Sequence, residues 1–356
     1  MKENKSQIIR KILFDQHRKS LWQIYKDIKW IKNKSPFKDK SIKFYFECLA
    51  YKKDAGKLEN YLPTSVYLRF KNDTPICQYH GKHPILGDKT KFKEFALKNN
   101  LPVAKHLGYI KNGFLKTVNT QELIDLNKQE EIKKLVNNWL NEHKVIFIKE
   151  SDTWSGLGVK KVSNWESFSK INFKKEKNYL IEEKITQKES LNKINPNCVI
   201  GLRVITVLKD NNPIIMGCHL RTGYGNSFLD TDKGLNVRYN IYENKLDKLG
   251  HQRWVKGGKS YNKQPFTNFK FENQPLPYPD KIIELVKYAA SLFPDQRLIG
   301  WDIAFTEQGP LIVEGNDSPA IVGMQMSFKG LLSNLYFREL YEEYFNENGT
   351  LKISLA

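Results

Sequence analysis

The sequence predicts an α+β fold, because strand-like and helix-like segments follow one another without the strict alternation that builds a parallel sheet. Hydrophobic residues make up 40% of the 356 residues and aromatic residues 12%, which is enough to bury a core. Charged residues make up 27%, and apolar residues recur at regular spacing, so the composition argues against disorder. The length predicts two or three domains, and we expect them to span residues 1–80, 81–182 and 183–356.

The N-terminal region, residues 1–34, is basic and helical in pattern. Leu21, Ile24 and Ile28 recur at helical spacing, with lysines between them. We favour a helix packed on the body with a solvated basic face, because core-facing helices are the commoner source of this pattern. The alternative is a helix lying on an anionic membrane surface. Residues 36–80 are rich in aromatic side chains but follow no period, so no element is assigned there.

The rest of the chain divides into helices and strands at recognisable signals. Asp88 is a good N-cap for a helix that ends near Asn99. Residues 223–279 are rich in Gly, Asn and Lys, which predicts a long, partly irregular connection. The other expected elements are helices over 130–141, 280–293 and 331–344, strands over 145–149, 159–162, 179–182, 199–209 and 213–222, and a strand pair over 298–316.

The net charge indicates what kind of partner the chain binds, and the cysteine usage indicates its redox compartment. The chain has 58 Lys and Arg against 39 Asp and Glu, a net charge of +19, which favours anionic partners. Nucleic acid ranks last among them, because no nucleic-acid-binding motif is found. The four cysteines form no CxxC pair, which fits a reducing compartment. With no apolar run of membrane-spanning length and no signal peptide, we expect a cytoplasmic protein, the alternative being one peripheral to the inner membrane through residues 1–34.

The segment from Gly300 to Asn316 carries the most specific chemistry. Two apolar strands flank the loop Thr306–Pro310, and a turn centred near residue 308 sets Asp302 opposite Glu314. Asn316 then shares their face, since side chains alternate with period 2. Two opposed carboxylates are destabilising unless a cation lies between them, and hard oxygen ligands suit Mg²⁺. The alternative is that Asp302 ends a strand and Glu314 pairs with a lysine.

Two further segments carry candidate anion-binding groups. A buried strand ends at Lys149 and is followed by a loop containing Gly156 and Gly158, whose backbone amides could cradle phosphates. In the hairpin 199–222, Arg203 lies opposite His219 and Arg221 lies diagonal to Arg203. Cations on an otherwise apolar hairpin need an anionic partner, because unpaired buried charge is costly. The partner is either a substrate phosphate or carboxylate, or a structural acid such as Glu182 or Glu189.

These blocks, in this order, resemble the ATP-grasp superfamily, and more narrowly the sugar-transfer-associated ATP-grasp proteins of bacterial capsule and polysaccharide biosynthesis. The resemblance covers about residues 85–321. It includes Leu86-Gly-Asp-Lys-Thr-Lys-Phe92, the Lys149 strand and its loop, Tyr179–Ile185 followed by Glu189, Leu202–Thr206, Arg221 and the Gly300–Asn316 block. The sequence departs from the pattern where Glu150, in place of a frequent proline, follows Lys149, and where the loop to Val159 is poorer in glycine.

The resemblance implies an ATP-grasp fold, in which two α+β subdomains grip ATP, preceded here by the basic helical region. It also implies roles for matching residues. Nucleotide binding falls to Lys89, Lys149, Ser155, Gly156, Gly158, Glu182, Glu183, Ile185 and Glu189. Mg²⁺ binding falls to Asp302, Glu314 and Asn316, and steadying of the transferred phosphoryl group or acyl intermediate falls to Arg203 and Arg221.

The activity that the resemblance implies is ATP-dependent ligation of a carboxylate to an amine through an acyl phosphate. Together with the positive charge, it points to an anionic small-molecule or glycan carboxylate, with a hexuronic acid as the leading hypothesis. One alternative is a ligase that makes peptides or other small amides without a sugar. Another is a non-catalytic nucleotide-binding scaffold at a polysaccharide assembly complex.

Overall fold

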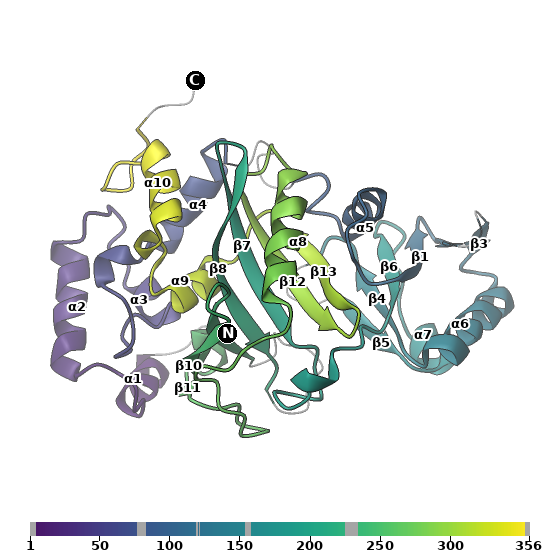
Figure 1. The fold of residues 1–356 in the computed structure, drawn as a ribbon, viewed down its shortest axis with the longest axis horizontal. Helices are drawn as coiled ribbons and strands as arrows, with labels where there is room; N and C mark the ends of the chain where they lie inside the picture. The colour runs from purple at the N-terminus through teal and green to yellow at the C-terminus, as the bar shows by residue number, and fades with distance from the viewer. Residues whose placement is uncertain are drawn as a thin grey trace.

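The computed structural model describes residues 5–76, 83–118, 120, 122–153, 158–224 and 234–352. Two antiparallel sheets form the body of the molecule, and helices cover them (Figure 1). The smaller sheet lies at one end, the larger sheet lies in the middle, and the N-terminal helices lie at the other end (Figure 1). The division of the chain at residues 80 and 182 stays a prediction.

The smaller sheet has six strands and one covered face. Its order is β3 (Leu123–Asp125), β2 (Phe114–Thr117), β1 (His106–Lys111), β6 (Tyr179–Glu183), β4 (Ile146–Glu150) and β5 (Val159–Val162). Ile146 and Ile148 point to a core shared with α6 (Gln129–His143) and α7 (Trp165–Ser169). Because side chains alternate along a strand, Phe147 and Lys149 point to the opposite face, which lines a cleft.

The larger sheet has seven strands and also keeps one face for the cleft. Its order is β11 (Ser260–Tyr261), β10 (Lys245–Gln252), β9 (Leu235–Asn240), β8 (Asn212–Thr222), β7 (Gly201–Lys209), β12 (Leu298–Thr306) and β13 (Gly309–Asn316). Trp301 and Ile303 pack with α8 (Pro279–Ser291) and α5 (Lys89–Lys98) on one face. On the other face, a second core joins one end of the sheet to α4 (Thr64–Asn72), α9 (Ile321–Phe328) and α10 (Leu335–Tyr344).

The N-terminal region is a small helical unit docked on the larger sheet. It contains α1 (Lys5–Leu13), α2 (Leu21–Asn33), α3 (Lys43–Glu47) and a 3-10 turn at Leu58–Asn60. Ile12, Ile24 and Ile31 are buried in a cluster that also takes in Trp254, so the favoured packed interpretation is confirmed for these side chains. The helical pattern of residues 1–34 is broken between Leu13 and Leu21, and α2 starts after Ser20, whose hydroxyl accepts from the Gln23 amide.

Some elements differ in extent from those expected, and others were not expected. Residues 234–279 are more regular than expected, because β9, β10 and β11 extend the sheet there. The strands β1 to β3 and the helix α9 were not expected, since they are short and have no clean period. The last helix begins at Leu335 rather than 331, because the Asn334 side chain caps it by accepting from the Phe337 amide. Every helix in the described part of the chain is too short or too polar to cross a membrane.

A buried ion pair fixes the N-terminal unit. The Lys52 ammonium contacts the Asp15 carboxylate and is almost inaccessible to solvent, and Tyr51 Oη donates to Asp15 over 2.7 Å. We expect Lys52→Met to lower the free energy of unfolding by about 3 kcal/mol, because it leaves Asp15 as a buried charge without its cation. Urea unfolding followed by circular dichroism measures this. The neighbouring exposed Lys53→Met is the control, and equal stability of the two variants would contradict the assignment.

Candidate functional site

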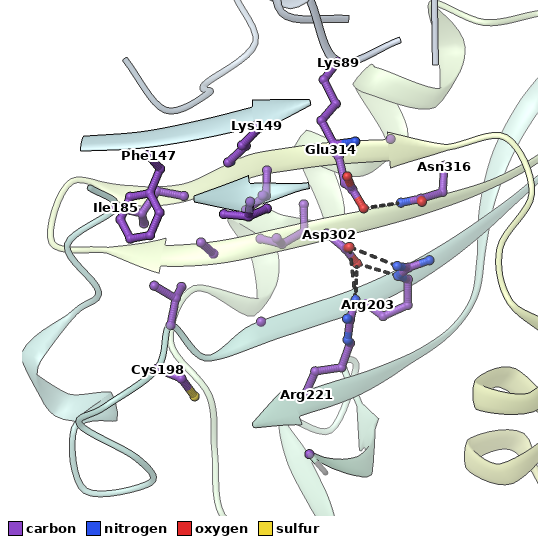
Figure 2. A pocket seen from close by; sticks show the side chains of 18 of the residues that line it. Lys89, Phe147, Lys149, Ile185, Cys198, Arg203, Arg221, Asp302, Glu314 and Asn316 are labelled. Carbon is purple, nitrogen blue, oxygen red and sulfur yellow. Dashed lines mark hydrogen bonds and ion pairs between the residues drawn. The ribbon is translucent and has the colours of Figure 1, made fainter. Parts of the chain in front are cut away.

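A single cleft of about 650 Å³ lies between the two sheets and collects most of the predicted site residues. One wall comes from the uncovered face of the six-stranded sheet, and the floor comes from the uncovered face of the seven-stranded sheet. Figure 2 shows Phe147 and Lys149 on the first, and Arg203, Arg221, Asp302 and Glu314 on the second. The sequence could place these residues on strands, but only the packing of the sheets brings them together.

Glu182 is the buried carboxylate of the wall. It is paired with two lysines: Lys149 Nζ lies 2.5 Å from Glu182 Oε2, and Lys93 contacts the other oxygen. Burial opposes ionisation of Glu182, but the charges of Lys149 and Lys93 outweigh it and lower the pKa of this carboxyl. Burial lowers the pKa of Lys93. Lys149 is thereby held at the cleft by a fixed counterion.

Lys93 was missed from the sequence. It sits on α5, eighty-nine positions before Glu182, and donates to the Ala104 carbonyl over 2.5 Å. On an amphipathic helix a lysine normally faces solvent, so no sequence signal distinguishes this buried one.

Lys89 reaches the cleft from the first turn of α5. Asp88 caps that helix by accepting from the amides of Thr90 and Lys91, as expected. Lys89 Nζ lies 3.5 Å from the Ser151 carbonyl and also contacts the Thr153 carbonyl, so the lysine is held against the loop after β4. Ser155 and Gly156, predicted in that loop, lie outside the described residues. At Gly158 a Cβ would come within 2.4 Å of Thr153 Oγ1 and 2.7 Å of Glu150 Cβ, so any other residue there would require its neighbours to shift.

The segment after β6 is only partly in the cleft. Glu183 and Ile185 line it, as the nucleotide prediction requires. Glu189 does not line it: this residue is exposed on a 3-10 turn, and its amide donates to Glu307 Oε1 over 2.9 Å. The structure therefore does not bring Glu189 to the other predicted nucleotide-binding residues.

The β12–β13 hairpin sets Asp302 opposite Glu314, as predicted. The turn is the two-residue loop Glu307–Gln308, which by itself would place Val313 opposite Asp302. A bulge at Val313 shifts the register by one residue and moves Glu314 into place. The expected pair is therefore correct, but a bulge rather than a longer turn produces it.

The β7–β8 hairpin behaves in the same way and sets Arg203 opposite His219. Its turn is Asp210–Asn211, both with positive φ, and the extra residue Met216 shifts the register. Arg221 faces Gly201 on β7, so no side chain stands between Arg221 and the neighbouring Asp302. Arg203 is directly paired with Asp302 across β7 and β12.

Asp302 is the anionic partner of both arginines, which the sequence left open. Arg203 binds it with two parallel bonds, Nε to Oδ1 at 2.5 Å and Nη2 to Oδ2 at 2.9 Å. Arg221 Nη1 lies 3.1 Å from each of the same oxygens (Figure 2). Burial would raise the pKa of Asp302, but Arg203 and Arg221 lower it to about 2. Asp302 is therefore ionised at every pH at which the protein would work.

The pKa of Glu314 is shifted in the opposite direction from that of Asp302. Burial and the adjacent Asp302 raise its pKa, and it shares a hydrogen bond with that residue. Asn316 Nδ2 lies 3.3 Å from Glu314 Oε1, and no ion pair reaches Glu314 within the described residues (Figure 2). The charges of Lys89 and Arg203 oppose this rise in pKa but do not cancel it. A divalent cation would further stabilise the ionised carboxylate, so the oxygens of Asp302, Glu314 and Asn316 fit Mg²⁺. Since the described residues hold no cluster of three His, Cys, Asp or Glu, phosphates or water would complete the coordination.

His219 also lines the cleft and was not selected from the sequence. Burial, with Arg203 and Arg221 next, lowers its pKa to about 3, so the ring is neutral at physiological pH. Its Nδ1 is buried and has no hydrogen-bond partner in the described part of the chain. The only signal available beforehand was its predicted position opposite Arg203.

Two antiparallel sheets that enclose a cleft, with lysines on one wall and carboxylates and arginines on the floor, define the ATP-grasp fold. Residues 75–336 match the family described as sugar-transfer associated ATP-grasp. This match covers most of the sequence, and the chain belongs to that family.

Solved structures give a weaker likeness. D-alanyl-alanine synthetase A from Vibrio cholerae is 17% identical, with a TM-score of 0.41, over 72% of this chain and 63% of that one. N5-carboxyaminoimidazole synthase from Aspergillus clavatus, in complex with ADP and a ribonucleotide, is 14% identical, with a TM-score of 0.39, over 70% and 52%. This chain thus spans less than two thirds of the length of either protein. A search of curated proteins finds no match.

The raised pKa of Glu314 has a measurable consequence for stability. A native state that binds this proton more tightly than the unfolded state loses stability as pH rises through the raised pKa. In metal-free buffer at pH 7–8, we therefore expect Glu314→Gln to raise Tm, by about 2 °C for each kcal/mol of strain removed. The gain shrinks toward pH 4.5, because the unfolded state, whose carboxyl has a pKa of 4.5, increasingly binds the proton as well.

The measurement is a calorimetric scan of both proteins from pH 4.5 to 8 with chelator present. The exposed Glu94→Gln on α5 is the control, because it removes the same charge without burial. A Tm difference for Glu314→Gln that is absent, or independent of pH, would contradict the electrostatic account.

Proposed function

We propose that this chain is an ATP-dependent carboxylate–amine ligase acting on a hexuronic acid, free, nucleotide-linked or within a glycan, in capsule or polysaccharide biosynthesis. The observation that carries the proposal is the row Glu314, Asp302, Arg203 and His219, set across four adjacent strands under a wall of lysines. A carboxylate pair for a metal lies beside two arginines for an anion, which is what phosphoryl transfer between two anionic substrates requires. The family description supports the sugar context.

The roles of the residues follow from where they lie. Lys89 and Lys149 would contact the nucleotide phosphates, and the backbone of Glu182–Ile185 would bind the adenine. Asp302, Glu314 and Asn316 would hold Mg²⁺, which neutralises phosphate charge when bound. Glu189 would hold the ribose only after the turn that carries it moves toward the cleft.

Arg203 and Arg221 would steady the phosphoryl group as it passes to the acid. In the proposed reaction, a carboxylate oxygen of the acid attacks the terminal phosphorus of ATP and ADP leaves. The amine then attacks the acyl carbon and phosphate leaves. Both arginines are rigidly held, so they would oppose negative charge in either step without reorganising.

Product analysis tests the ligase assignment. Purified protein with Mg·ATP, a panel of uronic acids and their nucleotide-linked forms, and a panel of amines should yield ADP, phosphate and a condensed mass for one acid–amine pair. We expect Lys149→Ala to raise the KM for ATP at least tenfold. Asp302→Asn should lower kcat by about 10²-fold or more, because it weakens both the metal site and the arginine anchor.

The matched control is Lys160→Ala, an exposed lysine on β5 that faces away from the cleft. Wild-type rates from folded Lys149→Ala and Asp302→Asn would refute the site. Release of AMP would overturn the acyl-phosphate chemistry. Nucleotide binding without turnover on any pair would favour the scaffold hypothesis, and turnover on amino acids or peptides alone would favour the ligase without a sugar.

We also propose that the N-terminal helices contact anionic lipid. Residues 5–34 contain nine Lys and Arg but only Asp15 and Asp27 as acids, and both acids pair with lysines inside the unit. Phe14 is 83% exposed and Trp22 is 63% exposed. Trp22 lies on α2, where the Lys26 ammonium is 5.2 Å from its ring centroid. Exposed aromatic rings beside lysines are typical of helices that lie at a membrane interface.

Co-sedimentation with vesicles tests this contact. We expect the chain to pellet with phosphatidylglycerol vesicles at low salt and much less with phosphatidylcholine, since each lysine near an anionic surface contributes about 1 kcal/mol. Phe14→Ser/Trp22→Ser should lower the bound fraction severalfold. Phe266→Ser, an exposed ring elsewhere on the surface, is the control. Equal pelleting of all three proteins would contradict the proposal.

A further inference from the structure

The turn between β10 and β11 contributes two cations to the lining of the cleft. This segment, Arg253–Gly258, is called the strap below. Arg253 and Lys256 line the same cleft as the nucleotide-side lysines. The strap follows β10 near the β11 edge of the seven-stranded sheet, while Glu314 lies on β13 at the opposite edge. Crossing the sheet, the floor changes from carboxylates on β13 and β12 to arginines on β7 and β8, and then to the strap.

The strap is held in place by the N-terminal unit rather than by the sheet alone. Trp254 is buried, with its ring centroid 5.7 Å from the rings of both Tyr51 and Phe46. Lys11 Nζ donates to the Trp254 carbonyl over 3.0 Å and lies 4.8 Å from the Trp254 ring centroid. Lys11, Phe46 and Tyr51 all precede residue 75, where the family match begins.

The backbone of the strap admits little freedom. Gly257 and Gly258 have φ of +131° and +67°, which other residues adopt only with strain. A Cβ on Gly258 would also lie 3.0 Å from the Trp254 ring. The Gly258 amide donates to the Arg253 carbonyl over 3.1 Å, which closes the turn. With Trp254 anchored, Arg253 and Lys256 on either side of it are directed to the cleft.

The groups that line this end of the cleft suit an anion. Arg253 and Lys256 lie at it together with the amide side chain of Asn236, and Arg221, already bound to Asp302, adds a guanidinium beside them. Asp54, the nearby acid of the N-terminal unit, is engaged by His251 at 3.1 Å. His219 adds a neutral ring with a buried, unpartnered Nδ1, which can hydrogen-bond a ligand without adding charge.

We propose that the strap is the binding site for an anionic group of the second substrate, and that residues 5–61 are a positioning unit for it. This proposal rests on the proposed ligase function and extends it: the nucleotide binds over β12–β13, and the acid binds toward the strap with Arg253 and Lys256 on a second anionic group. That group is a carboxylate in a uronic acid oligomer or a diphosphate in a nucleotide-linked uronic acid. A guanidinium and an ammonium together recognise either one.

Isothermal titration on the full chain tests the proposal. The affinity for Mg·AMPPNP is measured first, and the chain saturated with it is then titrated with UDP-glucuronic acid, digalacturonic acid or glucuronic acid. We expect Arg253→Gln/Lys256→Gln to weaken binding of the preferred dianion at least tenfold, with a smaller effect on glucuronic acid and an unchanged affinity for Mg·AMPPNP. The matched control is Lys259→Gln, an exposed lysine next to the strap that does not line the cleft.

The positioning role needs its own variants. Trp254→Ala keeps both cations but removes their anchor, so it should weaken binding of the dianion as the double variant does, whereas Trp254→Phe should restore most of it. Wild-type affinity in the double variant, or binding of nucleotide with none of the three acids, overturns the proposal. Failure to bind Mg·AMPPNP would instead refute the proposed function, so the two failures are distinguishable.

Discussion

The ion pairs of Asp302 with Arg203 and Arg221 are the interaction on which the cleft depends. They join β12, β7 and β8 across their uncovered face, where no hydrophobic core holds the side chains in place. All three groups are largely shielded from water, and removal of the carboxylate would leave two cations without their partner, at a cost of about 3–5 kcal/mol. The same strand register places Glu314 on β13 and His219 on β8, on either side of Asp302 and Arg203.

The same geometry sets a competition at Asp302. A carboxylate offers about four lone-pair directions, and the arginines make four contacts with it. Coordination of a cation by Asp302 therefore requires at least one arginine contact to open. An incoming phosphate supplies the alternative partner for that arginine, so metal binding and phosphate binding would reinforce each other. Glu314, whose pKa is raised by burial and by Asp302, would gain most from the cation.

Sequence reasoning located the parts of this site that depend on neighbouring strands. Strand alternation and hairpin pairing placed Asp302 against Glu314 and Arg203 against His219, although bulges at Val313 and Met216, which no residue pattern announces, produced both registers. It could not find groups that meet only after distant elements pack, such as Lys93 against Glu182. The anionic partner of the arginines stayed open for the same reason, since the pairing of β7 with β12 is set by the order of strands in the sheet.

The N-terminal unit would support the proposed substrate end of the cleft from outside the family-matched residues. The row from Glu314 to Arg221 lies within the family-matched residues and is held by strand pairing, so changes outside it leave it intact. The strap lies in the same segment, yet its anchor, Trp254, packs on Phe46 and Tyr51 from outside. Substitutions in the first sixty residues can thus move Arg253 and Lys256 without disturbing the nucleotide side. Under the proposed function, nucleotide binding and substrate selectivity would therefore be carried by separable contacts.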